Sequence, residues 1–208
     1  MIIFAGDSRS INIITKLKQH GWGRFVIERD INLYEGEPWG FDNGAYVDWV
    51  RGREFDGGAF YQRLKKFYAK GTPYLAVCPD LVTKGKESLA FSLSYMTHVL
   101  NQDWPWYLAV QDGMDIQDVE PVLHRFSGIF LGGSNEFKWS APAWCELAHR
   151  HGKLFHYGRI NSKRLAMARK IGADSADGTG LLWEEYKFTD FVRAFYTGKT
   201  QQELFGED

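Results

Sequence analysis

The chain has 208 residues, of which 44% are hydrophobic and 25% charged, and its formal net charge is −1. These values are typical of a globular protein with one continuous core, and they exclude the strongly basic field of many nucleic-acid-binding proteins. The 2 cysteines, Cys78 and Cys145, are too few for a disulfide framework and are not spaced as metal ligands. The sequence has no signal-peptide pattern and no apolar stretch long enough to span a bilayer, so we expect a cytoplasmic protein that does not associate with membranes.

Short apolar segments alternate with segments of helical spacing along the chain. Strands are predicted near residues 2–5, 24–28, 39–42, 73–80, 106–111, 128–133, from 154, and 174–177. Helices are predicted over residues 11–20, 56–69, 87–100, 116–125, 142–151, 161–172 and 182–196, with no convincing helix between the second and third strands. This alternation predicts a small (β/α)8 barrel, with an open doubly wound sheet as the alternative. We expect one domain over residues 1–198 and a polar tail over residues 199–208.

Acids, amides and glycines follow most of the predicted strands. They are Asp7, Asp42, Asp80, Gln111 with Asp112, Gly132 with Gly133, His156 with Gly158, and Asp177. In a barrel these residues would surround one mouth, where several carboxylates need a cation, a proton or a hydrogen-bonding ligand to offset their repulsion. The 6 histidines are scattered, which argues against a metal site, although oxygen ligation of Mg²⁺ stays open. A nitrogen heterocycle is the other group that could offset the repulsion between the carboxylates, because its N–H groups suit Asp and Gln acceptors.

Five short motifs at these strand ends resemble the tRNA-guanine transglycosylase superfamily of (β/α)8-barrel enzymes. In order they are Phe-Asp-Asn-Gly-Ala-Tyr (41–46), Cys-Pro-Asp (78–80), Val-Gln-Asp-Gly (110–113), Leu-Gly-Gly-Ser (131–134) and Gly-Ala-Asp-Ser-Ala-Asp (172–177). The resemblance implies that Asp177 is the nucleophile that attacks the anomeric carbon of the sugar, and that Asp42 is the acid/base beside the exchanged base. A covalent sugar-enzyme intermediate would then wait for an incoming base rather than water.

The same resemblance implies a set of substrate-binding residues, and we expect no cofactor. Asp80 and Gln111 would bind the edge of the base, Gly132 and Gly133 would do so through their backbone, and Tyr46 would stack on the ring. We also expect His156, at the end of the seventh strand, to belong to this set.

The sequence also departs from the superfamily pattern. Members that act on tRNA carry a zinc-binding module with several Cys and a His near the C-terminus, which this sequence lacks. Compact zinc-free relatives resemble enzymes that place 7-deazaguanine derivatives into DNA, so the sequence favours DNA over tRNA as the polynucleotide. Arg159, Lys163 and Arg164, in and before one basic helix, are predicted to contact its phosphates. A helicase or other ATP-dependent partner that opens the duplex would assist base flipping.

Two alternatives stay open at this point. One is a hydrolase or lyase that uses the same acids on a small nucleoside or sugar phosphate. The other is a barrel that binds a purine-like base without turning it over and serves as a partner subunit. The identity of the incoming base, the nucleotide context and the oligomeric state are not set by the sequence.

Overall fold

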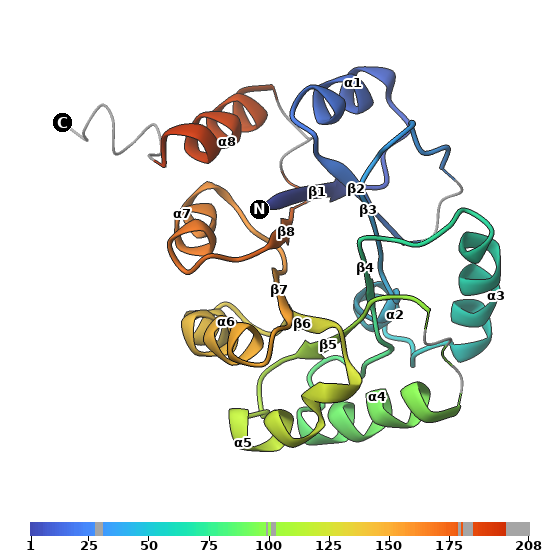
Figure 1. The fold of residues 1–208 in the computed structure, drawn as a ribbon. Helices are drawn as coiled ribbons and strands as arrows, with labels where there is room; N and C mark the ends of the chain where they lie inside the picture. Colours follow the sequence, from blue (N-terminus) through green and yellow to red (C-terminus); the bar gives the residue numbers. More distant parts are fainter. Residues whose placement is uncertain (28–30, 99, 101–102, 179, 181–184, 199–208) are drawn as a thin grey trace.

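The structure, a computed structural model, describes residues 1–27, 31–98, 100, 103–178, 180 and 185–198. Within this part of the chain, parallel strands form a closed barrel in which each strand pairs with the next in chain order. β8 pairs with β1 to close the ring, with Asp177 opposite Phe4. The helices lie around the outside (Figure 1), so the predicted small (β/α)8 barrel is confirmed. The strands are β1 (Ile2–Gly6), β2 (Gly23–Val26), β3 (Trp39–Phe41), β4 (Leu75–Val77), β5 (Trp106–Val110), β6 (Gly128–Leu131), β7 (Leu154–Tyr157) and β8 (Ser175–Asp177).

Several helices begin at a side chain that caps their first backbone N–H groups. Asp56 caps α3 and Asn161 caps α7, and Asp115 forms a capping box with Asp118 at the start of α5. The helices are α1 (Ile11–Gln19), α2 (Ala45–Val50), α3 (Gly57–Tyr68), α4 (Lys86–His98), α5 (Ile116–Val119), α6 (Ala141–Arg150), α7 (Ser162–Lys170), α8 (Glu185–Thr197) and the 3-10 helices η1 (Glu120–Arg125) and η2 (Phe137–Ser140). None of them, within the described ranges, is long and apolar enough to cross a membrane.

The barrel interior is filled by aromatic and aliphatic side chains. Its central cluster consists of Phe4, Phe25, Leu75, Val77, Tyr107 and Ala109. Phe25 stacks on Phe130 with ring centroids 6.0 Å apart, and the His156 ring stacks on Phe130 at 4.8 Å. A Cβ atom at Gly40 would lie 2.2 Å from the Phe25 ring, so glycine is needed there. The interior is therefore closed below the mouth.

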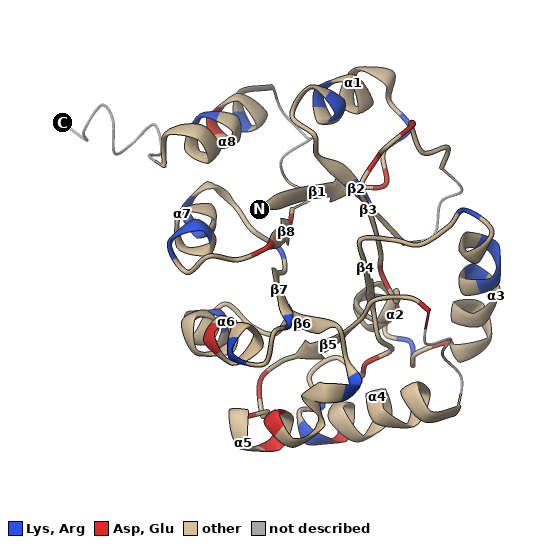
Figure 2. Ribbon diagram, viewed as in Figure 1, with Lys and Arg blue, Asp and Glu red and all other residues tan. Residues whose placement is uncertain are grey.

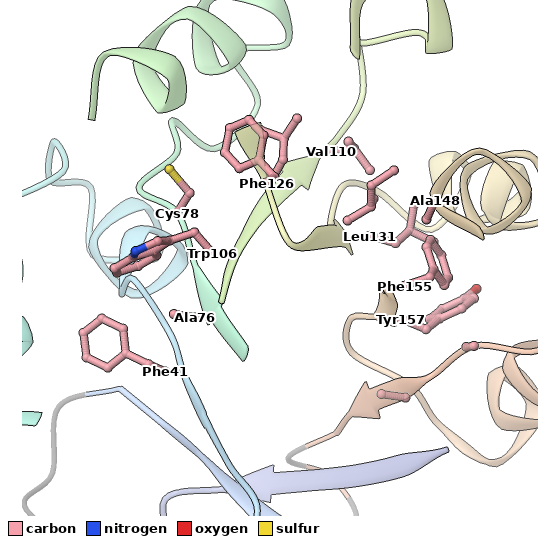
Figure 3. Close-up of a cluster of buried hydrophobic side chains, with 14 of the residues drawn as sticks. Phe41, Ala76, Cys78, Trp106, Val110, Phe126, Leu131, Ala148, Phe155 and Tyr157 are labelled. Atoms are coloured by element: carbon pink, nitrogen blue, oxygen red, sulfur yellow. The ribbon is translucent and has the colours of Figure 1, made fainter. Parts of the chain in front are cut away.

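A second and larger core fills the space between the barrel and its helices. Strand residues alternate in direction, so Ile3 and Ala5 face this outer core while Phe4 faces inward. Figure 3 shows part of it, with Phe41 and Trp106 on one side and Phe155 on the other. Each fully buried large side chain contributes about 1.5–3 kcal/mol, so this layer holds the strand ends in place.

Most predicted elements are present, with ends that differ by a few residues. The fourth strand is shorter than the predicted 73–80, because Pro73 and Pro79 cannot donate to the strand ladder. The predicted helix 116–125 divides into α5 and η1 at Pro121. Residues 182–184 of the predicted last helix, residue 28 of the second strand and the predicted tail 199–208 lie outside the described residues.

The sequence did not predict α2, which directly follows β3. Gly44, with φ of +80°, turns the chain into this helix, and Asp48 within it is buried and accepts a 2.6 Å hydrogen bond from Arg53. The turn leaves Tyr46 and Trp49 45% and 48% exposed, with ring centroids 5.8 Å apart. α2 therefore presents two aromatic rings beside the end of β3.

Candidate active site

Three aspartates lie at the carboxyl ends of strands. Asp42 follows β3, Asp80 lies three residues after β4, and Asp177 ends β8. Asp177 is 8% exposed, whereas Asp42 and Asp80 are partly accessible. Burial raises the pKa of Asp42, and with the nearby charges of Asp177 and Asp80 acting in the same direction it reaches about 7. The structure thus brings the two predicted catalytic acids and the first predicted base-binding acid together.

Asp177 is held by two donors on one of its oxygens. His156 Nε2 lies 3.0 Å from Oδ1, and the backbone N–H of Arg159 donates to the same oxygen at 3.1 Å. Both of these bonds are to Oδ1, whereas no hydrogen bond to Oδ2 is found among the described residues. The carboxylate is therefore held in one orientation by His156 and the Arg159 backbone.

His156 lies beneath Asp177 rather than at the surface of the mouth. The His156 side chain is fully buried, and its Nδ1 lies 2.8 Å from the Ser175 hydroxyl. Burial lowers the pKa of His156, so the ring is neutral, with Nε2–H donating to Asp177 and Nδ1 accepting from Ser175. The ring is enclosed by the barrel core and supports Asp177, and the predicted contact of His156 with a substrate stays a prediction.

Asp80 is held by side-chain amides. Asn43 donates to its Oδ1 at 2.7 Å, and Gln111 Nε2 donates to its Oδ2 at 3.2 Å. Burial raises the pKa of Asp80 to about 6 despite these two hydrogen bonds. The Gln111 amide is also bonded to Leu81 and Ser88 and accepts the Thr83 N–H at 2.6 Å. Gln111 therefore supports Asp80, and its predicted contact with a base stays a prediction.

The Gly132–Gly133 turn follows β6, as its motif predicts. Gly133 has φ of +72°, and a Cβ there would lie 2.8 Å from an Asp112 oxygen. The N–H and hydroxyl of Ser134 both donate to Asp112, at 2.7 and 2.6 Å, and fix the turn. The Gly132 N–H donates to Val110 in the strand ladder, while the Gly133 carbonyl accepts from Arg159 at 2.6 Å. The backbone contacts to a base predicted for both glycines are untested.

Arg159 links opposite walls of the mouth. It follows β7, and its guanidinium lies 4.9 Å from the ring of Tyr46, which follows β3 on the opposite side of the eight-stranded ring. Its backbone has φ of 53°, a left-handed conformation that a residue with a side chain rarely adopts. The strained backbone is what directs its N–H to Asp177 and its side chain across the mouth.

Lys138 on η2 is a residue that the sequence analysis missed. It is 2% exposed, and its Nζ donates to the carbonyls of Leu131 at 2.9 Å and Gly158 at 2.7 Å. Burial lowers its pKa to about 7, and the charge of Arg159 acts in the same direction. Lys138 ties the end of β6 to the end of β7, where the glycine turn and Arg159 begin. No local pattern distinguishes it from a surface lysine.

The two remaining predicted phosphate contacts lie on the first turn of α7. Lys163 is exposed, and Arg164 donates to the backbone carbonyl of Arg159 at 3.0 Å and to the side chain of Asn135. α7 carries basic residues and no acidic ones (Figure 2). A basic face therefore adjoins the residue that holds Asp177.

Comparison with models of protein families gives no match, and comparison with curated proteins gives none either. Among the described residues, no group of three or more His, Cys, Asp or Glu side chains is placed to hold a metal ion. The functional interpretation therefore depends on the motifs and on the geometry of the mouth.

Proposed function

We propose that this barrel is a base-exchanging pentosyltransferase that replaces guanine with a 7-deazaguanine base in a polynucleotide, with DNA favoured over tRNA. The observation that supports it best is the pairing of two unlike carboxyl groups at one mouth. Asp177 is fixed by two donors on one oxygen, and Asp42 beside it has a pKa of about 7. One group is suited to attack and the other to donate and accept a proton at neutral pH.

In the first half-reaction, Oδ2 of Asp177 forms a bond to the anomeric carbon as the bond from that carbon to the guanine nitrogen breaks. The electron pair of the broken bond goes to the guanine ring, and Asp42 transfers its proton to the departing base. The donors on Oδ1 keep the carboxylate in line with the anomeric carbon. The product is a sugar ester of Asp177.

In the second half-reaction, Asp42 accepts the ring N–H proton of the incoming base. The nitrogen so exposed attacks the anomeric carbon, and the ester bond breaks with its electron pair returning to Asp177. Water must be kept from the ester, and the stacked rings of Phe25, Phe130 and His156 close the barrel below it. Exchange rather than hydrolysis is expected from this enclosure.

The base is recognised by acceptors at the neighbouring strand ends. Guanine and its 7-deaza analogues present ring and exocyclic N–H donors, which match the Asp80 carboxyl group held by Asn43 and Gln111. The backbone of the Gly132–Gly133 turn follows β6 and is the predicted contact for the edge of the ring, and the 45% exposed side chain of Tyr46 is available for stacking.

The test is a trapping assay with guanine-containing single-stranded DNA, duplex DNA and tRNA, read as a covalent adduct on denaturing electrophoresis. Asp177→Asn keeps an oxygen that accepts from His156 and Arg159 but cannot form a stable sugar ester, so the adduct should disappear. Glu146→Ala removes an exposed carboxylate on α6 and serves as the matched control. Circular dichroism should show that both variants are folded.

The same assay separates the alternatives. Incorporation of labelled 7-deazaguanine that persists in Asp177→Asn would refute the nucleophile assignment. Turnover of free nucleosides without any polynucleotide adduct would identify a small-nucleoside hydrolase, and base binding without turnover would identify a partner subunit.

A further inference from the structure

A groove lies beside the mouth, between η2 and α7. Its volume is about 420 Å³, which is within the range of sites that bind small molecules. Tyr157 and Met167 contribute apolar surface, and Trp139 lines one side with 75% of its surface exposed. An exposed indole at the edge of an apolar groove offers a face on which a flat ring can stack.

The other side of the groove is basic. Lys163, Arg164 and Lys170 line it from α7, and the helix has no acidic residue to neutralise them. In Figure 2 α7 carries blue segments and no red one, whereas the neighbouring helix α6 carries a red segment. The apolar floor with its aromatic wall suits the base of a nucleotide, and the cationic rim suits its phosphate.

The groove is connected to the catalytic acids through Arg164. This side chain lines the groove and donates to the Arg159 carbonyl at 3.0 Å, and the Arg159 N–H donates to Asp177 at 3.1 Å. Two hydrogen bonds thus separate the groove from the proposed nucleophile. A nucleotide in the groove would be a close neighbour of the sugar at Asp177.

We propose that this groove binds the nucleotide adjacent to the exchanged one in a single-stranded nucleic acid, with its base on Trp139 and its phosphate on Lys163 and Arg164. The inference rests on the proposed base exchange, to which it adds the requirement for a flanking nucleotide. It gives the enzyme a reason to prefer a polynucleotide over a free nucleoside, because a nucleoside has no group to place in the groove.

The test uses Trp139→Ala and Lys163→Glu, each in an Asp177→Asn background so that binding is measured without turnover. Fluorescence anisotropy of a labelled single-stranded oligonucleotide, in DNA and RNA versions, gives the affinity. Loss of one base-aromatic stack should weaken binding about tenfold in Trp139→Ala. Lys163→Glu should weaken binding and lower the slope of affinity against salt by about one.

Matched controls come from α3, on the opposite side of the barrel. Tyr61→Ala removes a ring that is 52% exposed, and Lys65→Glu reverses an exposed charge on another basic helix. Both should bind the oligonucleotide as the parent does. A loss of equal size in the controls would overturn the proposal, because the effect would then be one of general surface charge or stacking.

A double-mutant cycle combines the Trp139→Ala variant with oligonucleotides that carry an abasic site at either position flanking the target guanine. At one of the two positions the abasic site should weaken the parent about tenfold and leave Trp139→Ala unaffected. If an abasic site at neither position changes the effect of Trp139→Ala, the groove does not bind the flanking base. These binding measurements do not require base exchange. Oligonucleotide binding through Trp139 without any Asp177 adduct would therefore refute the proposed function but not the assignment of the groove as a nucleotide site.

Discussion

Asp42 has a pKa of about 7, so formation of the covalent adduct should depend steeply on pH. The proposed first half-reaction needs Asp42 in its protonated form, to supply a proton to the departing guanine. With a pKa of about 7, the protonated fraction is about 0.9 at pH 6, about 0.1 at pH 8 and about 0.01 at pH 9. The single-turnover rate should therefore be nearly level below pH 6 and fall tenfold per unit above pH 7.

The assay is the initial rate of adduct formation without an incoming base, measured from pH 5.5 to 9. Asp42→Asn should be slow at every pH and lack the fall near pH 7. Asp80→Asn removes a charge that raises the pKa of Asp42, so its midpoint should move to lower pH. A wild-type rate that is level from pH 6 to 9, or an unchanged fall in Asp42→Asn, would refute the assignment of Asp42 as the acid.

The same titration affects the stability of the fold. The folded pKa of Asp42 lies above its ordinary value of 3.8, so the group favours the folded state most at low pH, and this contribution is lost as pH rises from about 4 through 7. A shift of about three pH units corresponds to about 4 kcal/mol, which we reduce to about 1–2 kcal/mol because the side chain is partly accessible. Asp42→Asn should therefore gain free energy of unfolding relative to wild type between pH 4 and 7. Denaturant titrations at pH 4.5 and 7.5 measure it, and an equal difference at both pH values would contradict the linkage.

His156→Phe keeps a stacked ring but removes the donor to Asp177. A hydrogen bond to a charged group contributes about 1.5–3 kcal/mol, so kcat should fall about tenfold to hundredfold, and KM should not change. Gly133→Ala, at φ of +72° and against two close neighbours, should lose more free energy of unfolding than Gly152→Ala, at φ of +64° with nothing within 4 Å, which should lose about 1 kcal/mol. Arg24→Met breaks a buried pair with Glu37 at 2.7 Å and should cost about 3–5 kcal/mol in denaturant unfolding, most of which the double variant with Glu37→Leu should recover.

The strands and the residues that end them could be predicted because they depend on local patterns. Short apolar runs that stop at an acid or a glycine are visible in the sequence, and parallel pairing then places Asp42, Asp80 and Asp177 at one mouth. The helix α2 could not be predicted in this way. Its residues, Ala-Tyr-Val-Asp-Trp-Val, include β-branched and aromatic types that favour strands, and the turn at Gly44 with the burial of Asp48 decides the outcome.

The direction in which a buried side chain points also could not be predicted from the sequence. His156 and Gln111 occur at strand ends, as expected, but the packing of the barrel turns His156 under Asp177 and engages the Gln111 amide with Asp80. The burial of Lys138 is the hardest of these features to predict, because its stretch, Phe-Lys-Trp-Ser, resembles a surface turn. Only the tertiary structure places its ammonium group between two strand-end carbonyls.

Arg159 connects Asp177, the basic groove and Tyr46. Its N–H donates to Asp177, its carbonyl accepts from Arg164 in the basic groove, and its guanidinium contacts Tyr46 across the mouth. In the proposed complex a base stacks on Tyr46, and a phosphate offers the guanidinium a second partner of opposite charge. A polynucleotide supplies the base and the phosphate together, whereas a free nucleoside supplies only the base. This pairing of groups is a further reason why we propose a polynucleotide rather than a small nucleoside as the substrate.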